Sequence, residues 1–88
     1  MVRKHIYFSG RVQGVGFRYR SCHIARSLGL TGWVKNCWDG RVEMEVQGSR
    51  RDIGRLLEEL HQQRFTVIET MDIEDIPCER ESEFREIY

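Results

Sequence analysis

The chain has 88 residues, a length that suits one small domain and excludes a two-domain enzyme. Hydrophobic residues make up 40% and charged residues 32%, with eight Gly and one Pro, so the composition predicts a folded globular chain and excludes the disordered and collagen-like classes. No apolar run has the length of a membrane span, and the polar N-terminal residues do not resemble a signal peptide, so we expect a cytoplasmic protein.

The formal net charge of zero hides an asymmetry between the two halves of the chain. Residues 1–44 hold eight basic and two acidic residues, a net charge of +6, and residues 45–88 carry the opposite charge. Because no Asp or Glu precedes Asp39, a pocket built from the first 38 residues has no carboxylate to repel an anion. We therefore expect an anionic ligand, although solvated charges that alternate by chance would give the same totals.

The first half of the chain predicts a strand and then a helix. Residues 4–10 place Ile6 and Phe8 two apart and end at Gly10, which is typical of a central strand. A helix is expected over about 18–28, where apolar residues recur at helical spacing, and Gly29 follows its last turn as a stop signal.

A β-hairpin is expected next, with strands at 31–36 and 41–47 around the Asp39-Gly40 dipeptide, because this dipeptide tolerates the positive φ angles of a tight turn. In the second strand of the hairpin, apolar and polar residues alternate. Its inward residues are Val42, Met44 and Val46, and its expected water-facing residues are Arg41, Glu43, Glu45 and Gln47.

The second half of the chain predicts a helix over about 50–63, which carries an apolar stripe of one Ile and three Leu, and a strand over 66–76. In that strand the expected alternation runs through Val67, Glu69, Met71 and Ile73. A short closing strand is expected within 84–88. Right-handed crossovers then interleave two βαβ units into one α+β domain over 1–88, a ferredoxin-like βαββαβ sandwich with two helices on one face of a mixed sheet.

The segment from Gly10 to Arg18 joins the first strand to the first helix and contains three glycines. Successive N–H groups in such a turn can form an anion-binding concavity, and the helix that follows points its positive end at the same place. Arg18 could add a bidentate hydrogen bond to a phosphate. The nucleotide-binding patterns GxxxxGK[ST] and GxGxxG are absent, and a purely structural turn would also use such glycines.

The three cysteines do not indicate a disulfide framework or a metal site, because their number is odd and they lack CxxC spacing. Cys22 and His23 are adjacent, and adjacent helix positions point in different directions, so they do not form a nucleophile and its base. We expect Cys22, Cys37 and Cys78 to be reduced thiols. Trp33 and Trp38 are expected to pack against the domain, or Trp38 to shape the mouth of a pocket.

The motifs VQGVGFR at 12–18 and LGLTGWVKNCWDGRVE at 28–43, with Gly48 after the third strand, resemble those of the acylphosphatase family over most of the chain. The resemblance implies a small α/β sandwich that hydrolyses the carboxyl-phosphate bond of acyl phosphates to a carboxylate and inorganic phosphate. It also implies that the reaction needs no metal and no organic cofactor. We further expect a monomer that binds neither nucleic acid nor membrane.

In that family the arginine of the first motif, here Arg18, holds the phosphate, and the asparagine of the second, here Asn36, positions the attacking water. The substrate cradle implied by the resemblance consists of Gln13, Gly14, Val15, Gly16, Phe17 and Arg18. From its residue type alone, Asn36 could instead be a strand-end residue that bonds backbone near the hairpin turn.

Two positions depart from the family pattern. Ser49 stands where the family often has Pro, and Glu86 stands where an apolar residue is expected near the C-terminus, so the register of the last strand stays open.

Two other classes of protein share features with this chain. RNA-recognition motifs share the element order, but the third strand lacks their stacking aromatics, and Glu43 and Glu45 would repel a phosphate backbone. A non-catalytic phosphate-sensing or interaction domain would keep the same cradle, and the residues alone leave that alternative open.

Overall fold

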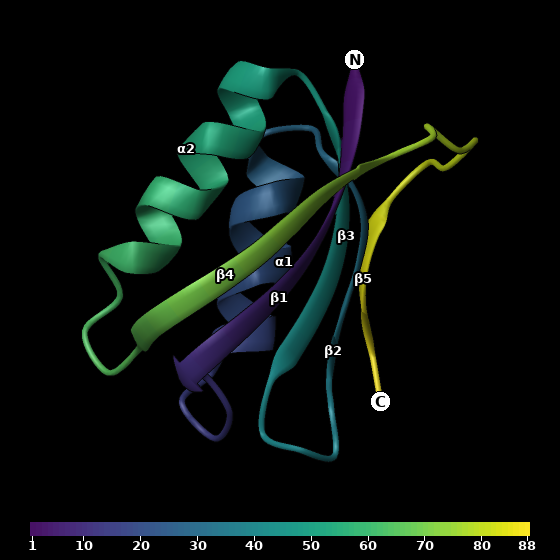
Figure 1. Cartoon of the computed structure of the whole chain (residues 1–88). Helices are drawn as coiled ribbons and strands as arrows, with labels where there is room; N and C mark the ends of the chain where they lie inside the picture. Colours follow the sequence, from purple (N-terminus) through teal and green to yellow (C-terminus); the bar gives the residue numbers. More distant parts are fainter.

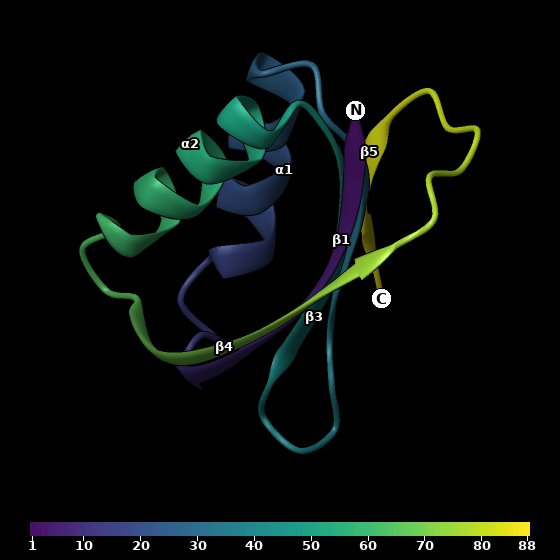
Figure 2. The same cartoon turned by 45° about the horizontal axis from the view of Figure 1, so that its top comes forward.

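A computed structural model describes residues 1–88, and its elements follow the predicted order. The strands are β1 (Val2–Arg11), β2 (Thr31–Asn36), β3 (Val42–Gly48), β4 (Val67–Ile76) and β5 (Phe84–Ile87), and the helices are α1 (Phe17–Ser27) and α2 (Arg50–His61). Figure 1 shows the sheet as one layer and both helices as the other, and Figure 2 shows that the helices lie side by side on the same face. Neither helix is long and apolar enough to cross a membrane.

The sheet order is β4-β1-β3-β2-β5, and every neighbouring pair is antiparallel except β2 and β5, which are parallel. Because β1 and β2 both lie against β3, they run in the same direction and are joined through α1. In the same way β3 and β4 flank β1 and are joined through α2. The predicted mixed sheet with two interleaved βαβ units is therefore confirmed.

The core lies between the sheet and the helices, because the apolar side chains that alternate along the strands and those that recur every three or four residues along the helices face each other there. Ile6 and Phe8 of β1 face the same side as Val42, Met44 and Val46 of β3, and all five are buried. The helices contribute the other half of the core with Phe17, Cys22, Ile24, Ala25, Ile53, Leu56 and Leu60.

The alternation expected for β4 is wrong at its start. A bulge opposite Ser9 and Gly10 shifts the register, so that Ile68 pairs with Gly10 while Thr70 pairs with Ser9. The extra residue moves Ile68 onto the core side together with Met71, and Val67 is 53% exposed. Gly10 permits this irregularity because a Cβ there would lie 2.2 Å from the carbonyl oxygen of Val67.

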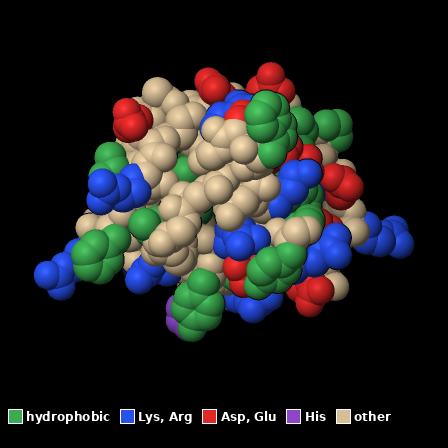
Figure 3. Space-filling model, turned by 90° about the horizontal axis from the view of Figure 1, so that it is seen from below, with side chains coloured by type: hydrophobic (Ala, Val, Ile, Leu, Met, Phe, Trp, Pro, Cys, Tyr) green, Lys and Arg blue, Asp and Glu red, His purple; other side chains and the backbone are tan.

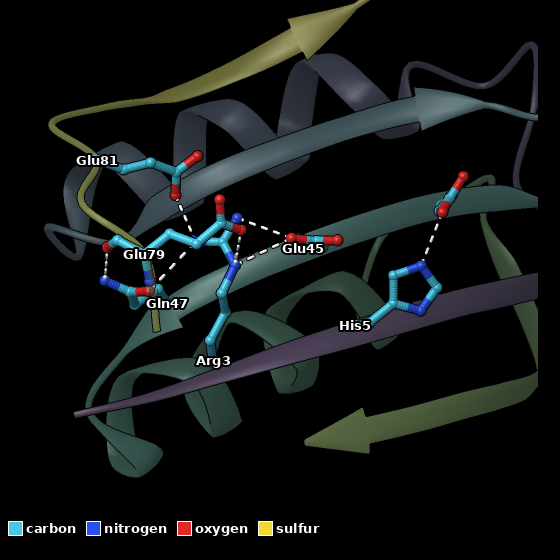
Figure 4. Close-up of polar contacts among 7 residues, drawn as sticks. Arg3, His5, Glu45, Gln47, Glu79 and Glu81 are labelled. Atoms are coloured by element: carbon cyan, nitrogen blue, oxygen red, sulfur yellow. Dashed lines mark hydrogen bonds and ion pairs between the residues drawn. The ribbon is translucent and has the colours of Figure 1, made fainter. Parts of the chain in front are cut away.

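The face of the sheet away from the helices is partly covered by residues 77–83, which connect β4 to β5. Arg3 of β1 is 1% exposed and forms ion pairs with Glu45, Glu79 and Glu81 (Figure 4). Burial acts to lower the pKa of Arg3, but its hydrogen bonds to Glu81 and Glu45 raise that pKa above its ordinary value. A buried charge is tolerated when it is paired in this way.

Gln47 belongs to the same cluster, and its expected exposure to water is wrong. Its side chain is 6% exposed, accepts hydrogen bonds from Arg3 and from the N–H of Glu79, and donates one to the carbonyl oxygen of Glu79. The connection from β4 to β5 is therefore fastened to the open face of the sheet at Arg3 and Gln47.

Two glycine substitutions test how closely the strands approach each other. Gly32 of β2 has φ +139°, and a Cβ there would lie 1.9 Å from the carbonyl oxygen of Glu45. We expect Gly32→Ala to lower the free energy of unfolding by about 2–4 kcal/mol. Gly54 lies in α2 with open space around it, so Gly54→Ala should raise that free energy by about 0.5–1 kcal/mol. Urea unfolding measures both, and an unchanged midpoint for Gly32→Ala would contradict the close approach of β2 and β3.

Candidate active site

The loop 12–16 between β1 and α1 turns through two glycines in the left-handed region. Gly14 has φ 73° and Gly16 has φ 77°, conformations that other residues adopt only with strain. Backbone N–H groups in such a turn can converge on one anion. Gly16 is also the residue from which α1 begins, so the turn and the start of the helix form one continuous stretch of backbone.

The N-terminus of α1 is not capped by the chain itself. Gly16 supplies no side-chain hydrogen bond, and the first turn of α1 holds no acidic residue. In α2, by contrast, the Ser49 hydroxyl accepts a hydrogen bond from the N–H of Asp52, at 3.0 Å. Because the first N–H groups of a helix have no partner inside the helix, α1 offers its donors and its positive end to an external anion.

A cavity of about 140 Å³ lies where the loop, the start of α1, the end of β2 and strand β5 meet. Larger and more open depressions occur elsewhere on the surface, but their linings lack this combination of free amides, guanidinium and side-chain amide. The residues that line the small cavity are Val12, Gly14, Gly16, Phe17, Arg18, Asn36 and Glu86.

Arg18 reaches this cavity with its charge unneutralised. Its Nη1 donates a hydrogen bond of 3.1 Å to the carbonyl oxygen of Ile87, and its guanidinium lies over the Tyr88 ring, 4.8 Å from the centroid. Neither partner carries a formal charge. No ion pair of the chain includes Arg18, so its positive charge is available to a ligand.

Asn36 is the last residue of β2 and lies on the side of the sheet that faces the helices. Side chains alternate along a strand, so Asn36 shares this side with the buried Val34. Other groups hold the neighbouring turn: Cys37 N–H donates to the carbonyl oxygen of Arg41, and the Asp39 carboxylate accepts from the N–H of Arg41. The alternative role for Asn36, bonding backbone at this turn, is therefore filled by other residues.

Gln13 and Val15 are placed differently from the rest of the predicted cradle, because neither side chain lines the cavity. The Gln13 side chain donates hydrogen bonds of 2.7 and 2.8 Å to the carbonyl oxygens of Cys37 and Arg41. The carbonyl oxygen of Val15 accepts one of 2.6 Å from Arg20 Nη1. These bonds fasten the loop to the hairpin and to α1.

Glu86 corrects the expectation that the pocket holds no carboxylate. That expectation considered only the first 38 residues, whereas β5 lies parallel to β2 and brings Glu86 opposite Val34. Phe84 is buried in the core, so Glu86, two residues further on, lies on the same side of the sheet. The signal that could have found Glu86 was its departure from the family pattern at that position.

The end of the molecule that carries the loop and the hairpin is rich in basic side chains. Figure 3 views this end directly and shows Lys and Arg on both flanks, with acidic side chains interspersed. A broader depression of about 450 Å³ also reaches Asn36, and Trp38 lines it with 99% of its surface exposed. The expectation that Trp38 packs against the domain is therefore wrong.

No group of three or more His, Cys, Asp or Glu side chains is arranged so that it could hold a metal ion. The three cysteines are free, with Cys22 buried, Cys37 half-buried and Cys78 exposed. Burial, with a smaller contribution from the charge of Glu86, raises the pKa of the Cys22 thiol to about 11. Cys22 is therefore a neutral core residue at physiological pH.

Comparison with known proteins gives one consistent family. The acylphosphatase family model matches residues 4–86. The chain is 47% identical to an acylphosphatase of Bifidobacterium longum over 78 residues, which covers 88% of this chain and 80% of the relative. It is 45% identical to one of Geobacillus kaustophilus over 91 residues, covering 100% and 96%. The crystal structure of acylphosphatase from Bacillus subtilis matches with a TM-score of 0.93 at 33% identity over the full length of both chains.

Thiol labelling tests the environments of the three cysteines. At pH 8, a pKa of about 11 leaves roughly one Cys22 in a thousand as thiolate, and burial also blocks the reagent. In the native protein we expect an aromatic disulfide reagent to modify Cys78 first and Cys22 only after unfolding. Mass spectrometry of the digested products identifies each site, and rapid native labelling of Cys22 would contradict its buried position.

Proposed function

Because the chain belongs to the acylphosphatase family, we propose that Arg18 and the loop amides bind the phosphoryl group of its substrate while Asn36 positions the attacking water. The enzyme is an acylphosphatase: it hydrolyses the carboxyl-phosphate bond of acyl phosphates and releases a carboxylate and inorganic phosphate. The observation that carries the residue assignment is the cavity in which Arg18, Asn36 and the uncapped start of α1 meet.

The phosphoryl group is held by donors that need little rearrangement. Gly14 and Gly16 set the path of the loop backbone, and the amides at the start of α1 add donors that the chain leaves unpaired. The bond from Arg18 to Ile87 limits the freedom of the guanidinium before substrate arrives. Phosphoryl transfer relies mainly on positioning and on stabilising charge spread over the equatorial oxygens, and such fixed donors supply both.

Asn36 orients the water without removing a proton. Its side-chain amide can accept one hydrogen bond and donate another, which fixes the oxygen of a water in line with the phosphorus. The new bond forms between that oxygen and phosphorus, the bond from phosphorus to the acyl oxygen breaks, and its electron pair goes to the departing carboxylate. A carboxylate is a weak base and leaves unprotonated, and both water protons can remain on the product as dihydrogen phosphate. The hydrolysis therefore requires neither a general acid nor a general base from the protein.

The whole chain is proposed to act as one acylphosphatase-like domain and as a monomer in the cytoplasm. The cavity already brings Arg18, Asn36 and the start of α1 together within one chain, so the proposed chemistry requires no residue from a second copy. The three unpaired thiols support a reducing compartment. Analytical ultracentrifugation tests the first point: a dimer at micromolar concentration, with activity that falls on dilution, would contradict it.

Substitution of Arg18 tests the phosphate site. Arg18→Ala removes the guanidinium, and we expect turnover of benzoyl phosphate to fall by about 10³- to 10⁵-fold. Arg18→Lys keeps the charge but loses the bidentate geometry, so it should restore only part of the rate. Arg51→Ala, on the exposed face of α2, is the matched control and should leave turnover unchanged. Phosphate release is measured with EDTA present, and near-normal turnover of Arg18→Ala would refute the assignment.

Substitution of Asn36 tests whether this residue positions the attacking water. Asn36→Ala should reduce kcat by about 10²-fold because the nucleophile is misplaced. Binding of inorganic phosphate should persist, since Arg18 and the loop amides remain, and competitive inhibition measures it. Loss of phosphate binding together with kcat would show that Asn36 holds the phosphoryl group rather than the water.

A further inference from the structure

Glu86 places a carboxylate in a cavity that is otherwise built for an anion. It is half-buried, and it lines the cavity together with Arg18 and Asn36. Its position follows from the pairing of β5 with β2, in which Phe84 enters the core and Glu86 follows on the same side. The mechanism proposed above makes no use of this carboxylate.

Glu86 has no ion-pair partner in the chain. None of the eight ion pairs includes Glu86, and its one side-chain partner is the Tyr88 hydroxyl, which donates to Oε2 at 3.2 Å. Arg18 is held instead by the Ile87 carbonyl and the Tyr88 ring. The cavity therefore presents one unpaired positive charge and one unpaired negative charge to the same ligand.

We propose that Glu86 is a specificity-determining residue that penalises each negative charge of the ligand, so that the site discriminates between singly and doubly charged tetrahedral oxyanions. This inference rests on the proposed function, because it requires the anion to bind beside Arg18. Repulsion between like charges grows with the charge of the ligand, and it is screened less in a partly buried cavity than at an open surface. Glu86 thus weakens the hold of the enzyme on a doubly charged phosphoryl group more than on a singly charged one such as dihydrogen phosphate.

The same repulsion favours the reaction. In the loose transition state the phosphoryl group resembles metaphosphate, which carries one negative charge, while the departing carboxylate takes the other. Glu86 therefore opposes the phosphoryl group of the doubly charged substrate more strongly than that of the transition state. Interactions that differ in this way raise kcat at the expense of ground-state binding.

Sulfate and perchlorate provide a direct test, because both are tetrahedral oxyanions and they differ by one unit of charge. The variants are Glu86→Gln, which keeps the shape of the side chain, and Glu83→Gln, which removes the same charge from an exposed position on the same segment outside the cavity. Dissociation constants come from NMR titrations of the Gly14 and Gly16 amides at constant ionic strength. The amide spectrum of each variant also reports whether the fold is retained.

We expect Glu86→Gln to tighten binding of perchlorate by about threefold and of sulfate by about tenfold, since the second ligand charge repeats the effect of the first. In Glu86→Gln, KM for benzoyl phosphate should fall in parallel with the dissociation constant of sulfate, and kcat should fall as well. Glu83→Gln should leave both constants within about twofold of the wild type.

Equal changes for the two anions, or no change for either, would overturn the role of Glu86. A shift of the same size in Glu83→Gln would also overturn it, because the effect would then belong to the overall charge of the molecule. Failure of the proposed function looks different: sulfate would leave the Gly14 and Gly16 amides of the wild type unmoved, or would bind Arg18→Ala as tightly as the wild type.

Discussion

The structure depends on a helix that begins without a cap. The first N–H groups of a helix have no partner inside the helix, and Gly16, from which α1 starts, has no side chain that could accept from them, so these donors are left for an external partner. Helix α2 differs, because the Ser49 hydroxyl caps its N-terminus by accepting a hydrogen bond from the N–H of Asp52. An uncapped helix start beside a left-handed turn forgoes some stability and leaves a place where an anion can complete the hydrogen bonding.

The chain uses its arginines in two opposite ways. Arg3 is buried and surrounded by carboxylates, so its charge is satisfied within the fold, where it fastens the connection from β4 to β5 onto the sheet. Arg18 is held by a carbonyl oxygen and an aromatic ring, partners that restrict its movement without cancelling its charge. The partners of each guanidinium, rather than the residue type, separate the structural arginine from the one that lines the cavity.

Strand β5 links the two ends of the chain to one cavity. It pairs only with β2, yet it supplies the Ile87 carbonyl that holds Arg18 and the Glu86 carboxylate, and it is followed by Tyr88, whose ring lies against the Arg18 guanidinium. The basic first half and the acidic second half of the sequence therefore meet at the site. The electrostatics of the cavity result from that meeting and not from the first half alone.

The sequence by itself determined the element order, the two helices on one face, and the loop of glycines before α1, because these follow from local periodicity and from residues that permit particular φ angles. Where the register of a strand can shift, only the tertiary structure decided on which face of the sheet each side chain lies. The bulge beside Gly10 moved Ile68 to the core, Gln47 was covered by a distant connection, and β5 carried Glu86 into the cavity. Pairing between strands far apart in the chain depends on the total burial of both partners, which no local pattern contains.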